Sequence, residues 1–148
     1  MAIFLSDEQP EPVDDEDLVA LARHVLAARS VPGDMELSLL LVDAPTMAAL
    51  NEQHMGKQGP TDVLAFPIDE PGESPPDAPA VLGDVVLCPA VATEQAPHFG
   101  RTAHEELQLL TVHGILHLLG MDHDDPESER RMFALTDELL AGHRGRPA

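Results

Sequence analysis

Apolar and polar positions alternate along the chain in patterns that predict an α+β fold. Between Asp14 and Ser30, apolar residues recur at spacings of three and four, which is typical of an amphipathic helix with acids in its first turn. Residues 36–43 are apolar and bounded by turn residues, and this pattern indicates a buried strand. A proline suited to a first helical turn predicts another helix from Pro45 to Gly56.

The second half of the chain continues this alternation. Strands are predicted at 61–68 and 82–88, and Pro89 opens a short helix. The longest helical pattern covers 102–119, and a last helix starts with Asp125 as its cap. Together the patterns predict a mixed sheet of about four strands packed with about five helices.

Three segments lack such patterns. The early part of the acid-rich stretch 7–17 is expected to be a solvated loop, residues 69–81 a proline-rich surface loop, and residues 143–148 a frayed tail. No internal repeat or shift in composition divides the chain. We therefore expect a single domain over residues 1–148, a length that single domains commonly have.

Composition indicates a globular protein, because 43% of the residues are hydrophobic and the mean hydropathy is -0.10. No apolar run reaches the length of a membrane span, and residues 1–6 lack the features of a secretory signal. A cytoplasmic location without membrane contact is therefore expected. The single cysteine, Cys88, excludes a disulfide framework and a cysteine-rich zinc site, so metal binding would have to use histidine and carboxylate.

Charge argues against nucleic acid as a partner. The formal net charge of -19 repels phosphate backbones at long range. The chain has no Trp or Tyr and only four Phe, so the aromatic platform on which single-strand binders stack bases is hardly available. Composition alone thus favours other classes of ligand.

The strongest chemical signal is a set of three histidines. Residues four apart lie on one face of a helix, so the imidazoles of His113 and His117 can converge on one ion. Gly120 allows the chain to turn out of the helix with a positive φ, and this turn can bring His123 to the same point. Three imidazoles form a zinc site with one open position, which is the arrangement of catalytic sites.

Two alternatives weaken or redirect this prediction. A lone histidine on an apolar helix is usually a core residue, although the third histidine beyond a helix-stopping glycine disfavours that interpretation here. The spacing also equals that of the metzincin proteases, whose general-base glutamate is replaced here by Gly114. A metzincin-like metallopeptidase would therefore lack the group that deprotonates its water.

The stretch from His113 to His123 resembles the signature of the bacterial YbeY endoribonucleases, or rRNA maturation factors, at each fixed position. Two further stretches of the same family pattern follow the right order in the chain, at 60–67 and 82–85. The likeness covers residues 36–139, which is most of the chain.

This resemblance implies a zincin-like α+β fold with one zinc ion per chain, held by His113, His117 and His123. It further implies a hydrolase that cleaves single-stranded RNA in ribosomal RNA processing, notably at the 3′ end of 16S rRNA, and in ribosome quality control. DNA is not an expected partner. A ribosomal protein or assembly factor that presents the RNA would reconcile this activity with the acidic charge.

Two positions depart from the family pattern. Met55 stands where family members often carry an arginine, and Ala65 replaces the usual serine. Lys57, the only lysine in the chain, is the nearest substitute for the missing cation, with a solvated loop charge as an equal alternative. Arg101, just before the histidine helix, is a second weak candidate for substrate binding.

Several acids are weaker candidates. Asp122, beside the third histidine, is a candidate for orienting a ligand or accepting a proton, and turn capping is the equal alternative. Glu106 lies two turns before the histidines, and solvent exposure or a structural ion pair is favoured over a role near the metal. Asp62 and Asp84 fit the family pattern, although turn capping explains either of them.

The sequence leaves the attacking group open, since a zinc-activated hydroxide and the 2′-OH of the RNA are both consistent with it. It also leaves a third interpretation, in which zinc only braces the fold and the domain serves as a non-catalytic ribosome-assembly adaptor.

Overall fold

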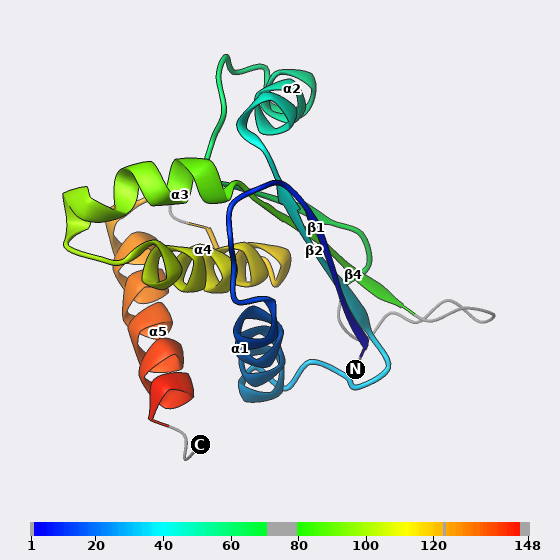
Figure 1. Cartoon of the computed structure of the whole chain (residues 1–148). Coiled ribbons are helices and arrows are strands. Elements are labelled where there is room, and N and C mark those ends of the chain that lie inside the picture. Colours follow the sequence, from blue (N-terminus) through cyan, green and yellow to red (C-terminus); the bar gives the residue numbers. More distant parts are fainter. Residues whose placement is uncertain (1, 71–79, 123, 146–148) are drawn as a thin grey trace.

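A four-stranded sheet forms the centre of the fold in the computed structural model, which describes residues 2–70, 80–122 and 124–145 (Figure 1). In chain order the elements are β1 (Ala2–Glu8), α1 (Asp15–Ala28), β2 (Glu36–Val42), α2 (Ala44–Met55), β3 (Val63–Pro67), β4 (Val81–Leu87), α3 (Pro89–Gln95), the 3-10 helix η1 (Ala96–Phe99), α4 (Ala103–Leu118) and α5 (Pro126–Arg144). The predicted α+β class with a mixed sheet and five α-helices is confirmed.

The strands lie in the order β1-β2-β4-β3. β1, β2 and β4 are parallel, and β3 runs antiparallel to β4. The β2–β4 register shifts at one point, where Glu36 pairs with Val81 and Leu37 pairs with Gly83. At Gly83 a Cβ would lie 2.4 Å from the carbonyl oxygen of Phe66, so only glycine fits where β3 approaches β4.

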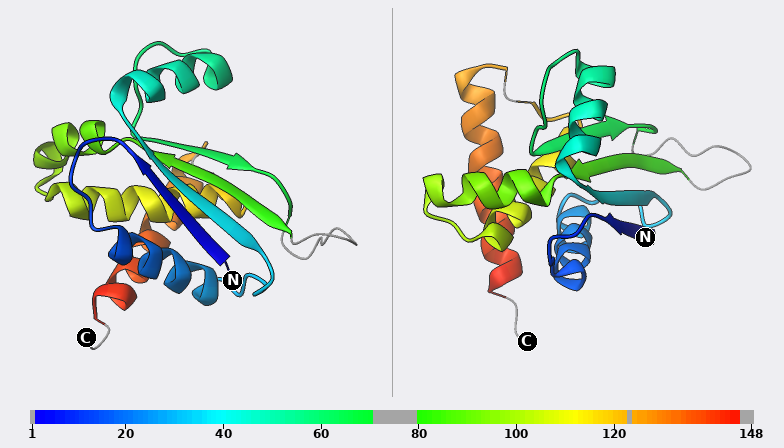
Figure 2. Two further views of the ribbon diagram at one scale, coloured as in Figure 1. Left: turned by 45° about the vertical axis from the view of Figure 1, so that its right-hand side comes forward. Right: turned by 45° about the horizontal axis from the view of Figure 1, so that its top comes forward.

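Helices cover one face of the sheet almost completely. α1 packs on β1, α4 packs on β3 and β4, and α5 packs on both α1 and α4 (Figures 1 and 2). Buried and partly buried side chains alternate along β2, so one face of the strand points toward the helices. The buried side chains in the main core are Leu37, Leu39 and Leu41, and the partly buried ones between them are Ser38 and Leu40. None of the helices in the described residues is long and apolar enough to cross a membrane.

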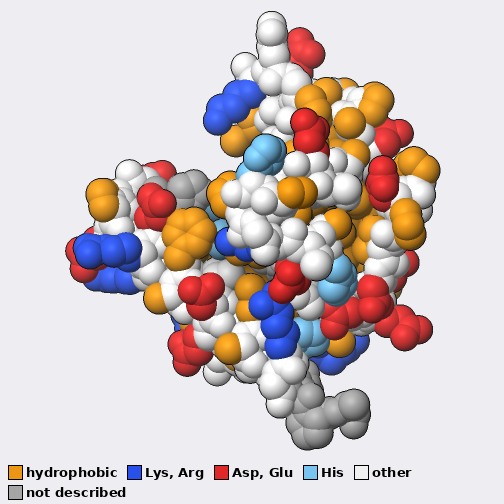
Figure 3. All heavy atoms as spheres, turned by 60° about the vertical axis from the view of Figure 1, so that its left-hand side comes forward, with side chains coloured by type: hydrophobic (Ala, Val, Ile, Leu, Met, Phe, Trp, Pro, Cys, Tyr) orange, Lys and Arg blue, Asp and Glu red, His pale blue; other side chains and the backbone are white. Residues whose placement is uncertain are grey.

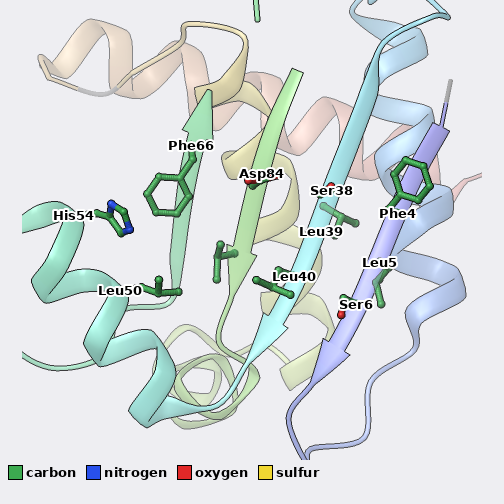
Figure 4. A pocket seen from close by; sticks show the side chains of 11 residues that line it. Phe4, Leu5, Ser6, Ser38, Leu39, Leu40, Leu50, His54, Phe66 and Asp84 are labelled. Atoms are coloured by element: carbon green, nitrogen blue, oxygen red, sulfur yellow. The ribbon is translucent and has the colours of Figure 1, made fainter. Parts of the chain in front are cut away.

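On the opposite face of the sheet, α2 covers one end, and the other described elements leave the rest open (Figure 4). Phe4, Ser38, Asp84 and Phe66 form a row across all four strands, and the His54 ring of α2 contacts the Phe66 ring edge-on at 5.0 Å (Figure 4). These side chains line an apolar groove that contains one carboxylate. The turn-capping interpretation of Asp84 was wrong, because the residue lies in the middle of β4.

Two predicted loops are partly structured. Asp7 and Glu8 were expected in a solvated loop, but they pair with Leu41 and Val42 as the end of β1, because backbone pairing outweighs the weak strand preference of acids. In the predicted loop 69–81, Val81 already belongs to β4, and its N–H donates to the Asp69 carboxylate at 2.8 Å. Residues 71–79 of that loop lie outside the described residues.

The predicted frayed tail was wrong for residues 143–145. α5 continues to Arg144, and the His143 side chain is only 9% exposed. Its Nε2 lies 2.9 Å from Asp17 Oδ1, while the Arg144 guanidinium donates to Gln108 Oε1 at 2.7 Å. These contacts fix the end of α5 against α1 and α4, and residues 146–148 lie outside the described part of the chain.

Asp17 is the centre of this polar cluster. His104 Nε2 lies 2.6 Å from Asp17 Oδ2, and Gln108 donates to the same oxygen at 2.8 Å. Burial alone would raise the pKa of Asp17, but the hydrogen bonds from His143, Gln108 and His104 hold it below its ordinary value.

Replacing Asp17 by asparagine is expected to lower the free energy of unfolding at pH 7 by about 1.5–3 kcal/mol, the range for hydrogen bonds to a charged group. Because the pKa of Asp17 is lower in the folded state, its carboxylate adds its full stabilisation to the folded state above the unfolded pKa of about 3.9. This stabilisation is lost as the pH falls through the folded pKa. Urea unfolding at pH 7 and pH 2.5 measures the difference. Equal stability at pH 7, or a difference that persists unchanged at pH 2.5, would contradict this role.

Candidate metal centre and RNA cleft

Helix α4 places two of the predicted histidines in one hollow. Thr102 caps the helix by accepting from the Glu105 N–H at 3.1 Å, and the Glu105 carboxylate accepts from the Thr102 N–H in return. At the other end Gly120 has φ +91 and ends the helix as predicted. His113 and His117, one turn apart, are half-buried and line the same hollow, which we call the α4 hollow.

The position between them lies against the sheet. A Cβ on Gly114 would lie 2.5 Å from Cγ1 of Val85 and 3.4 Å from Cγ2 of Val63. Because Val85 is fully buried in β4, it has little room to move. α4 can approach the sheet this closely only with glycine at position 114, and the general-base glutamate of a metzincin motif has no space there.

The α4 hollow also contains a fixed cation. Arg101 Nη1 lies 3.1 Å from Oε1 of Glu106, whose side chain is only 2% exposed, while the Arg101 side chain remains 34% exposed. The Arg101 guanidinium also lies over the Phe99 ring, 5.1 Å from its centroid. The structural ion pair predicted for Glu106 is therefore present. The lining of the hollow comprises Asp62, Val63, Gln95, Phe99, Arg101, Glu106, Leu109, Leu110, His113, His117, Glu129, Met132 and Phe133.

A second hollow adjoins the first. Lys57, Met55 and Asn51 line it together with residues of β3, and we call it the β3 hollow. His117, Asp62 and Val63 line both hollows. Lys57 and Arg101, the two predicted substrate-binding residues, thus line neighbouring hollows that meet at His117.

Asp62 is held at the junction of the two hollows. Its Oδ2 accepts from Gln95 Nε2 at 2.9 Å, and its Oδ1 accepts from the Val63 N–H at 2.8 Å. This turn-capping contact was predicted, whereas the bond from Gln95 was not, because it joins residues far apart in sequence. Gln95, Phe99, Glu129 and Phe133 of the α4 hollow carried no signal in the local pattern.

Asp122 is not brought into either hollow. It is exposed, lines a separate depression with Gly120, Ser128 and Arg131, and accepts from the Asp124 N–H at 3.4 Å. This contact favours the turn-capping alternative. Cys88 is buried, and desolvation raises the pKa of its thiol, so this residue acts as a small hydrophobic side chain of the core.

Comparisons with known proteins agree on one family. A profile described as endoribonuclease YbeY matches residues 4–144. The chain is 54% identical to the endoribonuclease YbeY of Acidothermus cellulolyticus, over 97% of this chain and 92% of the relative. It is also 54% identical to that of Beutenbergia cavernae, with 95% of each chain covered.

The chain belongs to the endoribonuclease YbeY family. A solved structure, the solution structure of TM1509 from Thermotoga maritima, superposes with a TM-score of 0.65 and 29% identity over 97% of this chain and 89% of that chain. The predicted resemblance and fold are therefore confirmed. As a member of the YbeY family, the chain is an RNA-cleaving hydrolase, so the metallopeptidase and adaptor alternatives are set aside.

YbeY-family enzymes are metal-dependent nucleases, and the α4 hollow has donors of the right kind. Two imidazoles spaced one helical turn apart face one hollow, which suits a late first-row metal ion. His123, the third predicted ligand, lies outside the described residues. Among residues 2–70, 80–122 and 124–145, no three His, Cys, Asp or Glu side chains are grouped to hold an ion.

Proposed function

We propose that this chain cleaves single-stranded RNA where the α4 and β3 hollows meet, with one zinc ion per chain held by His113, His117 and His123. We further propose that its substrate is the 3′ end of 16S rRNA, in the cytoplasm, and that it acts in ribosome quality control. The observation that carries the proposal is the meeting of both helix histidines with Arg101 in one hollow of a YbeY-family chain.

A zinc ion bound there supplies Lewis acidity toward a phosphodiester oxygen and favours ionisation of an oxygen nucleophile. The residues of the chain provide position and charge. Glu106 holds the Arg101 guanidinium at the wall of the α4 hollow, and a planar guanidinium has donors left for a phosphate. Lys57 contributes a point charge on the other side of His117, in the β3 hollow.

The three carboxylates of the α4 hollow differ in their hydrogen-bond partners and in their exposure to solvent. Glu106 is engaged by Arg101, and Asp62 by Gln95 and the Val63 N–H, so both act as positioning groups. Glu129 is exposed at the start of α5 and is the carboxylate of the hollow most open to solvent. Proton transfer therefore has to proceed without the motif glutamate that Gly114 excludes.

Two features can offset the acidic charge of the chain toward RNA: the cationic side chains of Lys57 and Arg101 in the two hollows, and a protein partner. The net charge is -19, and the face in Figure 3 carries many acidic side chains, with separate basic groups at its top, left and centre. We propose that a ribosomal protein or assembly factor with basic chemistry presents the RNA.

The test is cleavage of a labelled single-stranded 16S 3′-end fragment over a range of salt concentrations, beside the same RNA as a duplex, the matching DNA, and casein. Only the single-stranded RNA should be cut. Lys57→Ala and Arg101→Ala should each reduce the slope of log kcat/KM against log salt by about 0.7, the value for one phosphate contact on a single strand. A 2′,3′-cyclic phosphate product would identify the 2′-OH as the nucleophile.

Arg29→Ala is the matched control, because it removes an equal charge from the exposed end of α1. The control should leave the slope unchanged. If the salt-dependence slope falls equally in all three variants, Lys57 and Arg101 act only through the net charge of the chain and do not contact phosphates. Cleavage of casein in place of RNA would overturn the proposed function.

A further inference from the structure

Two of the four phenylalanines in the chain line the α4 hollow. Phe99 is 63% exposed and Phe133 is 45% exposed, and both are among the large apolar side chains that the described residues leave in contact with water. A third such residue, Met55, lines the adjoining β3 hollow. Single exposed apolar residues are ordinary, but this clustering around the histidines marks a binding surface.

Both rings are supported by residues of the site. Phe99 ends η1, and the Arg101 guanidinium packs over its ring, held from behind by Glu106. Phe133 comes from α5, and its ring lies 5.2 Å from the His113 ring with planes at 72°. Each ring is therefore held beside the histidines while a large part of its surface stays accessible.

Core packing does not account for these rings. The buried stripe of α5 consists of Met132, Thr136, Leu139 and Leu140, and Phe133 lies outside it. η1 buries Ala96 and leaves Phe99 exposed. Neither phenylalanine belongs to the main core cluster, so a smaller or polar residue would fit the fold at either position.

We propose that Phe99 and Phe133 are base-stacking residues that hold unpaired nucleobases while the phosphates of the strand face Arg101 and the histidines. The inference rests on the proposed function and adds the source of its strand selectivity. Bases in a duplex already stack on one another, whereas bases in a single strand have free faces for an aromatic ring. The scarcity of aromatic residues argued against stacking, but their placement in this hollow reverses that argument.

The absence of Trp and Tyr from the chain allows a direct test. Phe99→Trp and Phe133→Trp each introduce a single fluorophore, whose emission a stacked base quenches. A single-stranded RNA oligomer should quench both variants, whereas an abasic ribose-phosphate oligomer of equal charge should not. Phe4→Trp is the matched control, because Phe4 is 54% exposed on the open sheet face and should show no quenching.

A second measurement concerns the strength of binding to single-stranded RNA. Phe99→Leu and Phe133→Leu should each raise KM for single-stranded RNA about tenfold, within the range for loss of one base stack, with a smaller change in kcat. No quenching of either tryptophan by the RNA, or equal quenching by the abasic oligomer, would overturn the inference.

The readouts separate this inference from the proposed function. If the parent chain cleaves RNA but neither tryptophan variant is quenched, the proposed function holds and the stacking role of Phe99 and Phe133 is wrong. Quenching without RNA cleavage by the parent supports the stacking site and overturns the proposed function.

Discussion

His117→Ala is expected to reduce RNA cleavage at least about 100-fold, because even partners of metal ligands cost 10- to 100-fold when removed and a ligand should cost more. His117 lines both hollows and lies one helical turn from His113. Its side chain is half-buried, so its truncation removes no part of the main core. Cleavage should therefore be lost while the fold remains.

The measurement is single-turnover cleavage of the 16S fragment beside a thermal unfolding curve. His54→Ala is the matched control, because it removes an imidazole from α2 on the open face of the sheet. It should cleave at close to the parent rate. Parent-level cleavage by His117→Ala would exclude this residue from the reaction, and loss of cleavage only together with loss of folding would indicate a bracing role.

Gly114→Glu is expected to prevent stable folding and to yield no peptidase. The added Cβ alone meets Val85 at 2.5 Å, and overpacking of this kind costs about 1–3 kcal/mol. A carboxylate forced between α4 and the sheet without a partner adds several kcal/mol more. The sum approaches the total stability of an ordinary domain, which is about 5–15 kcal/mol.

Urea unfolding of a graded series measures this effect. Gly114→Ala should lose about 1–3 kcal/mol, and Gly114→Glu should lose most of the folded population. Gly33→Ala is the matched control, because a Cβ there meets nothing within 4 Å, and it should keep the parent stability. A Gly114→Glu variant that folds normally, or that cleaves casein, would show that α4 does not require glycine here.

Local chemistry made the ends of most elements predictable. Asp125 accepts from the Ser128 N–H as the cap of α5, as predicted, and Gly56 and Gly120 take positive φ where α2 and α4 stop. The spacing of His113 and His117 predicted their shared hollow, because the helical repeat alone determines which residues share a face.

Contacts between distant segments were not predictable from these patterns. The sequence predicts a frayed tail at His143, because no local signal shows that its side chain contacts Asp17 of α1. The composition gives the number of phenylalanines but does not show that Phe99 and Phe133 both line the α4 hollow. Tertiary packing decides such cases: Asp17 and His143 are 126 residues apart, and Phe99 and Phe133 reach the α4 hollow from η1 and α5.

Metal content and cleavage rate, measured on the same untagged preparation as zinc is removed and restored, test the central claim most directly. The account predicts about one zinc ion per chain and a rate proportional to occupancy, with His117→Ala binding little metal under the same conditions. Full-rate RNA cleavage by a chain stripped of metal would contradict it.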